Sequence, residues 1–225
     1  EYPGYYVWAC HETSNLPANI ELHDARTGQL LFGWGKNKDT GRSRAADIDP
    51  TYPGYELWGS TATVPMNIGG EKIADGFNEF YTRLSDGTYQ MNEDGTYMQG
   101  TLPMNFKIYW DGDLLSEFLD GIRVSKWNWT DKVIEVLFDA DGCASNCGTK
   151  AVPCAAADLS GDWRDEIVWK TEDESGIRIY STNIETRYRI PMLMHDRYYG
   201  ASVAMQNNHY NQPANVDFYL GYETT

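Results

Sequence analysis

Two matched segments, far apart in the chain, constrain the fold of this sequence more than any other feature. Residues 45–58 read AADIDPTYPGYELW and residues 156–169 read AADLSGDWRDEIVW. Each segment is a strand of small residues, then an acidic turn, then an outgoing strand that opens with Glu and reaches Trp. A unit of four short strands that recurs over roughly 40 to 50 residues is typical of a β-propeller blade. The sequence therefore predicts an all-β fold built of propeller blades.

The rest of the chain supports the same fold class. Short alternating apolar segments bounded by Gly, Pro, Asp and Asn recur, and no window shows the sustained period of a helix. A chain of this length holds about four blades, so we expect one partial propeller domain over 1–225 with further blades upstream. The polar segment 86–103 carries two DGTY copies and reads as an insertion loop or excursion hairpin. A twisted β-sandwich would also explain the strands, but not the repeated acidic turn.

The charge of the chain disfavours two classes of partner. A formal net charge of -15 argues against nucleic acid and anionic membrane surfaces, because both would repel the chain. No apolar run approaches the roughly 20 residues that span a bilayer, and no signal-peptide pattern begins the chain. Because the start enters an aromatic strand pattern without an initiator Met, we expect a processed chain or one cut from something longer. The acidity itself is also explained by the solubility of an exported protein.

Three of the four cysteines, Cys143, Cys147 and Cys154, crowd into one loop, and Cys10 lies apart. Their spacing, without a paired His, does not match the short C-x-x-C pairs of structural zinc sites. We expect a disulfide between two of the loop cysteines rather than free thiols, and such a bond suits an extracytoplasmic compartment. The pairing cannot be deduced from sequence.

The acidic turns have the ligand chemistry of calcium loops. Ca²⁺ takes about six to eight oxygen ligands, and a turn that folds back can bring carboxylates together. A third acidic stretch, YWDGDLLSEFLDG, holds four carboxylates at a less regular spacing, the last of which is Asp120. The candidate ligands are Asp47, Asp49, Glu56, Asp158, Ser160, Asp162, Glu166, Asp111, Asp113 and Glu117. The alternative is solvated Asp-Gly turns, and ions bound here would be mainly structural.

Residues for chemistry must therefore lie outside these turns. Lys150 sits on the cysteine-flanked loop beside Asn146, Gly148 and Thr149. It can act as a base if its pKa is depressed, or bind an acid group as a cation, or be a solvated surface charge.

Two further groups of side chains suit an acidic sugar. Arg42 and Arg44 precede the first acidic turn and could hold a carboxylate bidentately, or simply neutralise the turn. The segment QNNHYNQP, with Tyr210 and Asn211, combines amides and aromatics that suit sugar hydroxyls and pyranose faces, unless it is only a polar turn. No nucleophile elbow, phosphate-cradling loop or H-E-x-x-H motif occurs, which disfavours hydrolysis by a nucleophilic Ser.

Long motifs in the chain resemble a known family. They are HDARTGQLLFGWGKNKDTGRSRAADIDPTYPGYELW, YWDGDLLSEFLDG, SNCGTK, DLSGDWRDEIVW, LMHDRYYGASVAMQNNHYNQP and FYLG. Together they span nearly the whole chain and resemble the C-terminal portion of the rhamnogalacturonan lyases of polysaccharide lyase family eleven. The resemblance implies an eight-bladed, calcium-stabilised propeller that is secreted and degrades pectin. It implies that such an enzyme cleaves the rhamnose–galacturonate bond of rhamnogalacturonan I, an acidic polysaccharide, by calcium-assisted β-elimination.

The resemblance also implies roles for individual residues. Lys150 is the leading catalytic candidate, with Arg42 as its partner. The substrate-binding candidates are Asn146, Gly148, Thr149, Tyr210 and Asn211. The chain departs from the family pattern at Cys147, where an amide is usual, and the N-terminal blades of the enzyme are absent from the sequence. Two other functions therefore stay open: a non-catalytic, calcium-stabilised carbohydrate-binding propeller, and a purely structural or adhesive one.

Overall fold

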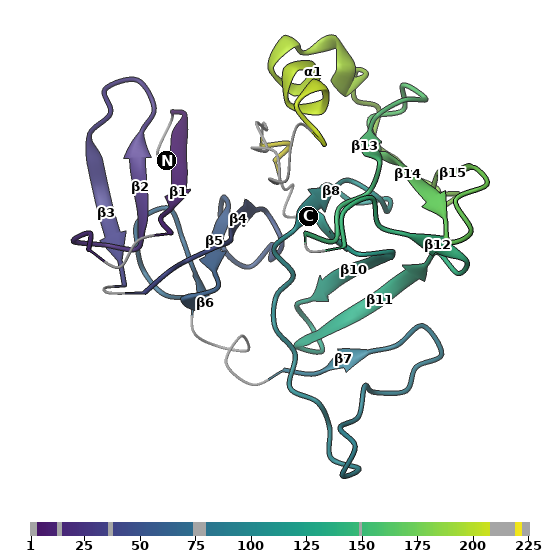
Figure 1. The fold of residues 1–225 in the computed structure, drawn as a ribbon. Helices are drawn as coiled ribbons and strands as arrows, with labels where there is room; N and C mark the ends of the chain where they lie inside the picture. The colour runs from purple at the N-terminus through teal and green to yellow at the C-terminus, as the bar shows by residue number, and fades with distance from the viewer. Residues whose placement is uncertain are drawn as a thin grey trace.

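The computed structural model describes residues 4–12, 15–35, 38–73, 80–148, 150–207 and 219–221. Over these residues the fold is all-β, as the sequence predicts, with one 3-10 helix and one α-helix near the C-terminus (Figure 1). No helix in this part of the chain has the length and apolar character needed to cross a membrane.

In the described part of the chain, the strands form four sheets that follow one another in sequence (Figure 1). The first sheet contains β1 (Tyr6–Cys10), β2 (Ile20–Asp24) and β3 (Leu30–Trp34), and the second contains β4 (Ser43–Ala46), β5 (Glu56–Gly59) and β6 (Ala62–Met66). The third has the order β7-β11-β10-β9-β8 and comprises β7 (Thr82–Arg83), β8 (Phe106–Ile108), β9 (Glu117–Asp120), β10 (Arg123–Asn128) and β11 (Val133–Asp139). The fourth comprises β12 (Cys143–Ala144), β13 (Ala155–Ala157), β14 (Glu166–Thr171) and β15 (Ile177–Tyr180). Paired strands are antiparallel except β7 and β11, which are parallel.

Among the residues that the structure describes, the strand–turn–strand unit occurs three times with one register. In the second sheet the last residue of β4 pairs with Glu56, the first residue of β5. The same pairing joins Ile108 of β8 to Glu117, and Ala157 of β13 to Glu166. The two copies visible in the sequence are therefore members of a series of three, and YWDGDLLSEFLDG contains the middle one.

The hydrophobic cores lie between successive sheets. Neighbouring residues of a strand point to opposite faces, so Phe118 of β9 packs on Trp58 of the second sheet, whereas Leu119 packs with Trp169 of the fourth. The indole N–H groups of Trp58 and Trp169 donate to backbone carbonyls beside the third sheet, at 3.1 and 2.9 Å. The third sheet thus has an apolar layer on both faces, which differs from the single shared layer of a two-sheet sandwich.

A short helical segment closes the fourth sheet. It consists of η1 (Leu193–His195) and α1 (Arg197–Ala204). Asp196 caps α1 by accepting two backbone N–H groups of its first turn, at 2.8 and 2.9 Å. Tyr199 of α1 accepts a hydrogen bond from the backbone N–H of Asp158 at 2.9 Å, and Gln206 exchanges two with the backbone of Ala156, at 2.8 and 2.7 Å. The helix is therefore held against β13.

The disulfide that the sequence suggests is wrong: all four cysteines are free thiols. Cys143 is buried in the core between the third and fourth sheets, with its Sγ 3.4 Å from the Tyr180 hydroxyl, and Cys147 packs against the same core. These side chains act as small apolar groups that fill space between sheets.

Candidate functional site

Each acidic turn is built around one buried glutamate. The first acidic turn is residues 47–56, the second 109–117 and the third 158–166. In each, the Oε2 atom of the glutamate accepts two consecutive backbone N–H groups from the start of the turn. The pairs are Ile48 and Asp49 with Glu56 (2.9 and 3.1 Å), Trp110 and Asp111 with Glu117 (2.7 and 3.3 Å), and Leu159 and Ser160 with Glu166 (2.7 and 2.8 Å). A carboxylate at the start of the outgoing strand thus sets the shape of the turn that precedes it.

The same turns connect one sheet to the next. The backbone N–H of Ser116, just before Glu117, donates to the carbonyl of Asp47 in the preceding turn at 2.7 Å. The backbone N–H of Asp165, just before Glu166, donates to the carbonyl of Tyr109 at 2.7 Å. The second and third turns are therefore each tied to the preceding turn by an equivalent hydrogen bond.

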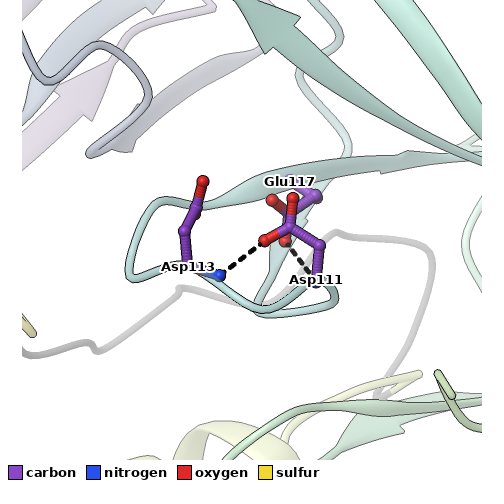
Figure 2. A group of neighbouring side chains, drawn as sticks. All are labelled: Asp111, Asp113 and Glu117. Atoms are coloured by element: carbon purple, nitrogen blue, oxygen red, sulfur yellow. Dashed lines mark hydrogen bonds between the residues drawn. The ribbon is translucent and has the colours of Figure 1, made fainter. Parts of the chain in front are cut away.

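The second acidic turn contains its own cation. Asp111, Asp113 and Glu117 bring ligand oxygens within 4.8 Å of one another, which no other trio of His, Cys, Asp or Glu does among the described residues (Figure 2). The ammonium of Lys126, on β10, donates to all three carboxylates, at 2.7 Å to Asp113 and 3.0 Å to Glu117. Burial raises the pKa of Glu117 to about 8, and the lysine opposes that rise. Asp120, which the sequence grouped with this turn, lies at the other end of β9.

The third acidic turn is satisfied by hydrogen bonds within the protein. Asp158 accepts three backbone N–H groups, two from its own turn and one from Leu193, at distances of 2.6 to 3.2 Å. Asp162 pairs with Arg164 at 2.6 Å. Most carboxylate oxygens of this turn thus have partners within the protein, without a bound ion.

The first acidic turn is different, because it holds buried oxygens that lack hydrogen-bond partners. Within the described residues, neither carboxylate oxygen of Asp47 nor Oε1 of Glu56 has one, and both side chains are buried. Asp49 accepts hydrogen bonds from Thr51 at 3.0 Å and from the Trp127 indole at 3.1 Å. Burial raises the pKa of Asp47 to about 7 and that of Glu56 well above its ordinary value. A buried carboxylate without partners is unfavourable unless it binds a proton or a cation. Carboxylate oxygens are also preferred ligands of Ca²⁺.

A buried lysine lies where the three turns meet. Lys107 of β8 is 6% exposed, and its ammonium is 4.0 Å from the ring centre of Tyr109. Burial lowers its pKa from 10.5 to about 7, while the nearby carboxylates of Asp165 and Asp47 act in the opposite direction. Together with Tyr199, it lines a small cavity of about 30 Å³ beside β13. Sequence analysis missed this residue, because a lysine in a strand usually faces solvent.

A second set of polar residues lies at the ends of β4, β8 and β9 that are away from the acidic turns. Arg42, which precedes β4, donates to the side chain of Asn105 at 2.9 Å, and Asn105 donates in turn to Asp120. The backbone N–H of Gly121 then donates to the carbonyl of Ala151 at 2.9 Å, next to Lys150. These contacts place the two predicted catalytic residues, Arg42 and Lys150, on the same end of the sheets, away from the acidic turns. No sequence pattern predicted that Asn105 and Asp120 would be linked to Arg42 by hydrogen bonds.

Arg44 does not take the role that its position beside the first turn suggests. Its guanidinium donates to the backbone carbonyls of Met104, at 3.1 and 3.3 Å, and of Asn105. It therefore joins β4 to the start of β8 rather than neutralising Asp47 and Asp49.

The predicted substrate-binding loop meets the amide-rich C-terminal segment. Asn146 donates a side-chain hydrogen bond to Asn207 at 2.7 Å, and Asn207 donates to the carbonyls of Pro153 and Cys154 at 2.9 and 2.5 Å. Gly148 is exposed and Lys150 is half-buried. The start of QNNHYNQP thus lies against the loop that carries Lys150. Thr149, Tyr210 and Asn211 lie outside the described residues.

Comparisons with known proteins identify relatives over the whole chain. The model of the rhamnogalacturonan lyase family 11 C-terminal domain matches residues 1–225. The chain is 42% identical to the rhamnogalacturonan endolyase YesW and 37% identical to the rhamnogalacturonan exolyase YesX, both of Bacillus subtilis (strain 168), with 97% of the chain covered in each case. It spans only 31% and 34% of those two proteins.

Solved structures agree with these relatives. The crystal structure of the rhamnogalacturonan lyase YesW matches with a TM-score of 0.80 at 42% identity, over 97% of this chain and 33% of that one. A Bacillus licheniformis rhamnogalacturonan lyase matches with a TM-score of 0.79 at 40% identity, over 97% of this chain and 33% of its own.

Replacing Lys126 with Met should destabilise the protein strongly, because three carboxylates would lose their shared cation. Breaking a buried ion pair on one side costs about 3–5 kcal/mol. The matched control is Lys170→Met, since Lys170 pairs with the exposed Glu174, and surface pairs contribute about 0–1 kcal/mol. Chemical denaturation in the presence of a chelator measures both. Equal losses in the two variants would contradict the role given to Lys126.

The pKa of Lys107 predicts a pH dependence of stability. The folded pKa is about 7 and the ordinary value is 10.5, so the unfolded chain binds more protons between these values. Above pH 8, where the raised pKa of Glu117 no longer opposes this effect, the free energy of unfolding should therefore rise with pH up to about 10. Lys107→Met should flatten that rise. Denaturation curves at several pH values test this, and a wild-type profile already flat over that range would rule it out.

Proposed function

Because this chain belongs to rhamnogalacturonan lyase family 11, we propose that the whole protein is a pectin-degrading polysaccharide lyase. It would cleave the rhamnose–galacturonate bond of rhamnogalacturonan I by β-elimination. The observation that carries this proposal is the match of the family's C-terminal domain to residues 1–225. The chain spans about a third of its relatives, so the remaining blades and part of the site would come from the rest of the enzyme.

The chemistry of β-elimination suits the residues on the end of the sheets that carries Arg42. A cation beside the galacturonate carboxylate stabilises the charge that develops when the C5 proton is removed. Arg42 would take that role, because its guanidinium is held in place by Asn105 at 2.9 Å. Lys150 would remove the C5 proton, and the C4–O bond would then break to form the C4–C5 double bond of an unsaturated uronate. The released sugar oxygen would take up a proton to become a hydroxyl. Asn146, Gly148, Thr149, Tyr210 and Asn211 would bind the sugar hydroxyls and ring faces.

We also propose that Ca²⁺ binds the acidic turns, and the first acidic turn is the best supported site. Asp47, Asp49 and Glu56 would hold the ion, since oxygens of Asp47 and Glu56 are buried without hydrogen-bond partners. Bound Ca²⁺ would supply positive charge to these carboxylates and stabilise the fold. In the second turn, Lys126 already supplies that charge to Asp111, Asp113 and Glu117, and in the third turn Asp158, Ser160, Asp162 and Glu166 are the candidate ligands.

The same proposal includes an eight-bladed propeller fold and secretion from the cell. Four successive sheets with apolar layers between them would form part of an eight-bladed propeller, completed by the upstream blades of the same enzyme. Secretion would place the enzyme with its polysaccharide.

A second candidate function is a non-catalytic sugar-binding propeller. It is favoured by Cys147, whose side chain packs against the core where the family pattern has an amide. Such a protein would bind pectic oligosaccharides without turning them over.

Lys150→Ala should abolish most of the lyase activity, because loss of a general base lowers rates by about 10²- to 10⁴-fold. The assay follows the ultraviolet absorbance of unsaturated uronate as the intact enzyme acts on rhamnogalacturonan I. Lys170→Ala, on β14, is the matched control and should keep wild-type activity. If wild type binds the polysaccharide but produces no absorbance, the second candidate function replaces the lyase.

Asp47→Asn should remove much of the stabilisation that calcium provides. A ligand that binds only the folded state at 100 times its Kd adds about 2.7 kcal/mol to the free energy of unfolding. Melting curves with calcium and with a chelator should therefore differ for wild type and differ less for Asp47→Asn. Asp173→Asn, at an exposed turn, is the control and should respond as wild type does. No effect of calcium on wild type would refute the site.

A further inference from the structure

Residues 81–103, here called the excursion, include β7 and contain a tandem repeat of eight residues. Neither the acidic turns nor the lyase proposal involves this repeat. Residues 81–88 read YTRLSDGT, residues 89–96 read YQMNEDGT, and a third copy begins at Tyr97. In each complete copy the Asp accepts hydrogen bonds from the backbone N–H and the hydroxyl of the Thr two residues later, at 2.9 and 2.6 Å. The repeated DGT turn makes each copy fold back in the same way.

This folding brings the first residue of every copy to one place. Backbone hydrogen bonds join Gln90 to Thr82 and Met98 to Gln90, both at 2.9 Å, so the three copies lie side by side. The ring centres of Tyr89 and Tyr97 are 5.3 Å apart, those of Tyr81 and Tyr97 5.4 Å, and those of Tyr81 and Tyr89 6.5 Å. Tyrosines eight residues apart in sequence therefore form one cluster, here called the tyrosine cluster.

The tyrosine cluster is exposed. Tyr97 is 55% exposed, Tyr81 38% and the neighbouring Met91 45%, while Tyr89 between them is half-buried. Rings that served only to hold the excursion together would be expected to hide more of their surface, and contiguous exposed apolar groups commonly mark a binding surface.

The position of the cluster keeps it clear of the other sheets. β7 is the edge strand of the third sheet, at the opposite edge from β8, whose flanking residues contact the second and fourth sheets. Figure 1 shows the excursion extending beyond β7, away from the other three sheets. Further blades that continue the series at either end would leave this edge open.

The charges around the cluster select among possible ligands. Residues 84–103 contain no Lys or Arg, and they contain the carboxylates of Asp86, Glu93 and Asp94. The nearest cation in sequence, Arg83, is engaged by Asp131 at 2.9 Å and Glu135 at 3.1 Å. A polyanion such as a galacturonate-rich segment would be repelled, whereas a neutral hydroxylated ligand would not.

We propose that Tyr81, Tyr89 and Tyr97 form a second carbohydrate-binding surface, which takes neutral sugar residues of a polysaccharide chain. Aromatic faces pack on the C–H groups of pyranose rings, and the phenol hydroxyls and the carboxylates of the DGT turns accept hydrogen bonds from sugar hydroxyls. The surface would hold neutral parts of the polymer while the site near Lys150 acts on its acidic backbone. The choice of a polysaccharide rests on the proposed function, but binding at the cluster does not require elimination.

Calorimetric titration of the intact protein with linear β-1,4-galactotetraose, a neutral probe, and with tetragalacturonate, an acidic one, tests the proposal. Galactotetraose should bind saturably and tetragalacturonate should not compete with it. Loss of one stacking ring should weaken binding about fivefold to tenfold in Tyr97→Ala. Tyr97→Phe, which keeps the ring, should retain most of the affinity. Tyr198→Ala is the matched control, because Tyr198 is 54% exposed but lies on α1.

Three results would overturn the proposal. They are the absence of saturable galactotetraose binding, binding that Tyr97→Ala leaves unchanged, and displacement of galactotetraose by tetragalacturonate. Self-association that Tyr97→Ala abolishes, measured by sedimentation, would instead assign the cluster to contact between two copies of the protein. Lyase activity on rhamnogalacturonan I is measured separately, so failure of the lyase proposal and failure of this one are distinguishable.

Discussion

The structure depends on one interaction that occurs three times: a buried glutamate accepts two consecutive backbone N–H groups from the turn before it. Glu56, Glu117 and Glu166 each stand at the first residue of an outgoing strand. Because the carboxylate binds the start of its own turn, it sets both the turn and the register of the strand pair. The residue just before it in the second and third turns is then placed to bind the preceding turn. The contacts between successive turns follow from this local geometry.

Burying acidic groups in this way is unfavourable unless their charge is compensated, and the three turns do so differently. Lys126 compensates the second turn, and backbone N–H groups and Arg164 compensate the third. In the first turn, the carboxylate oxygens of Asp47 have no hydrogen-bond partner among the described residues. A shared backbone shape therefore does not imply a shared ion site. Arg42, which we propose for the sugar chemistry, lies at the other end of the same strands, where it contacts Asn105.

Sequence analysis predicted the elements whose signal is local. The alternating strands, the acidic turns with Glu56 and Glu166, and the motifs of the family are each read from runs of consecutive residues. The middle turn was recognised only as an irregular acidic stretch, because Tyr109 stands where Asp47 and Asp158 stand in the other copies. The burial of Lys107, the partnership of Asn105 with Arg42, and Lys126 among three acids depend on contacts between strands distant in sequence. The expected disulfide was wrong because cysteine spacing does not tell whether a thiol is buried in a core.

Lys126 has a consequence for the order in which the molecule can assemble. A diffusible ion must be present at sufficient concentration before it can close a turn, whereas an ammonium on the same chain has an effective concentration set by covalent linkage. The middle turn can therefore close without a bound ion, because Lys126 already pairs with its three carboxylates. The third sheet, with an apolar layer on each face, would then be a ready template on which its two neighbours dock.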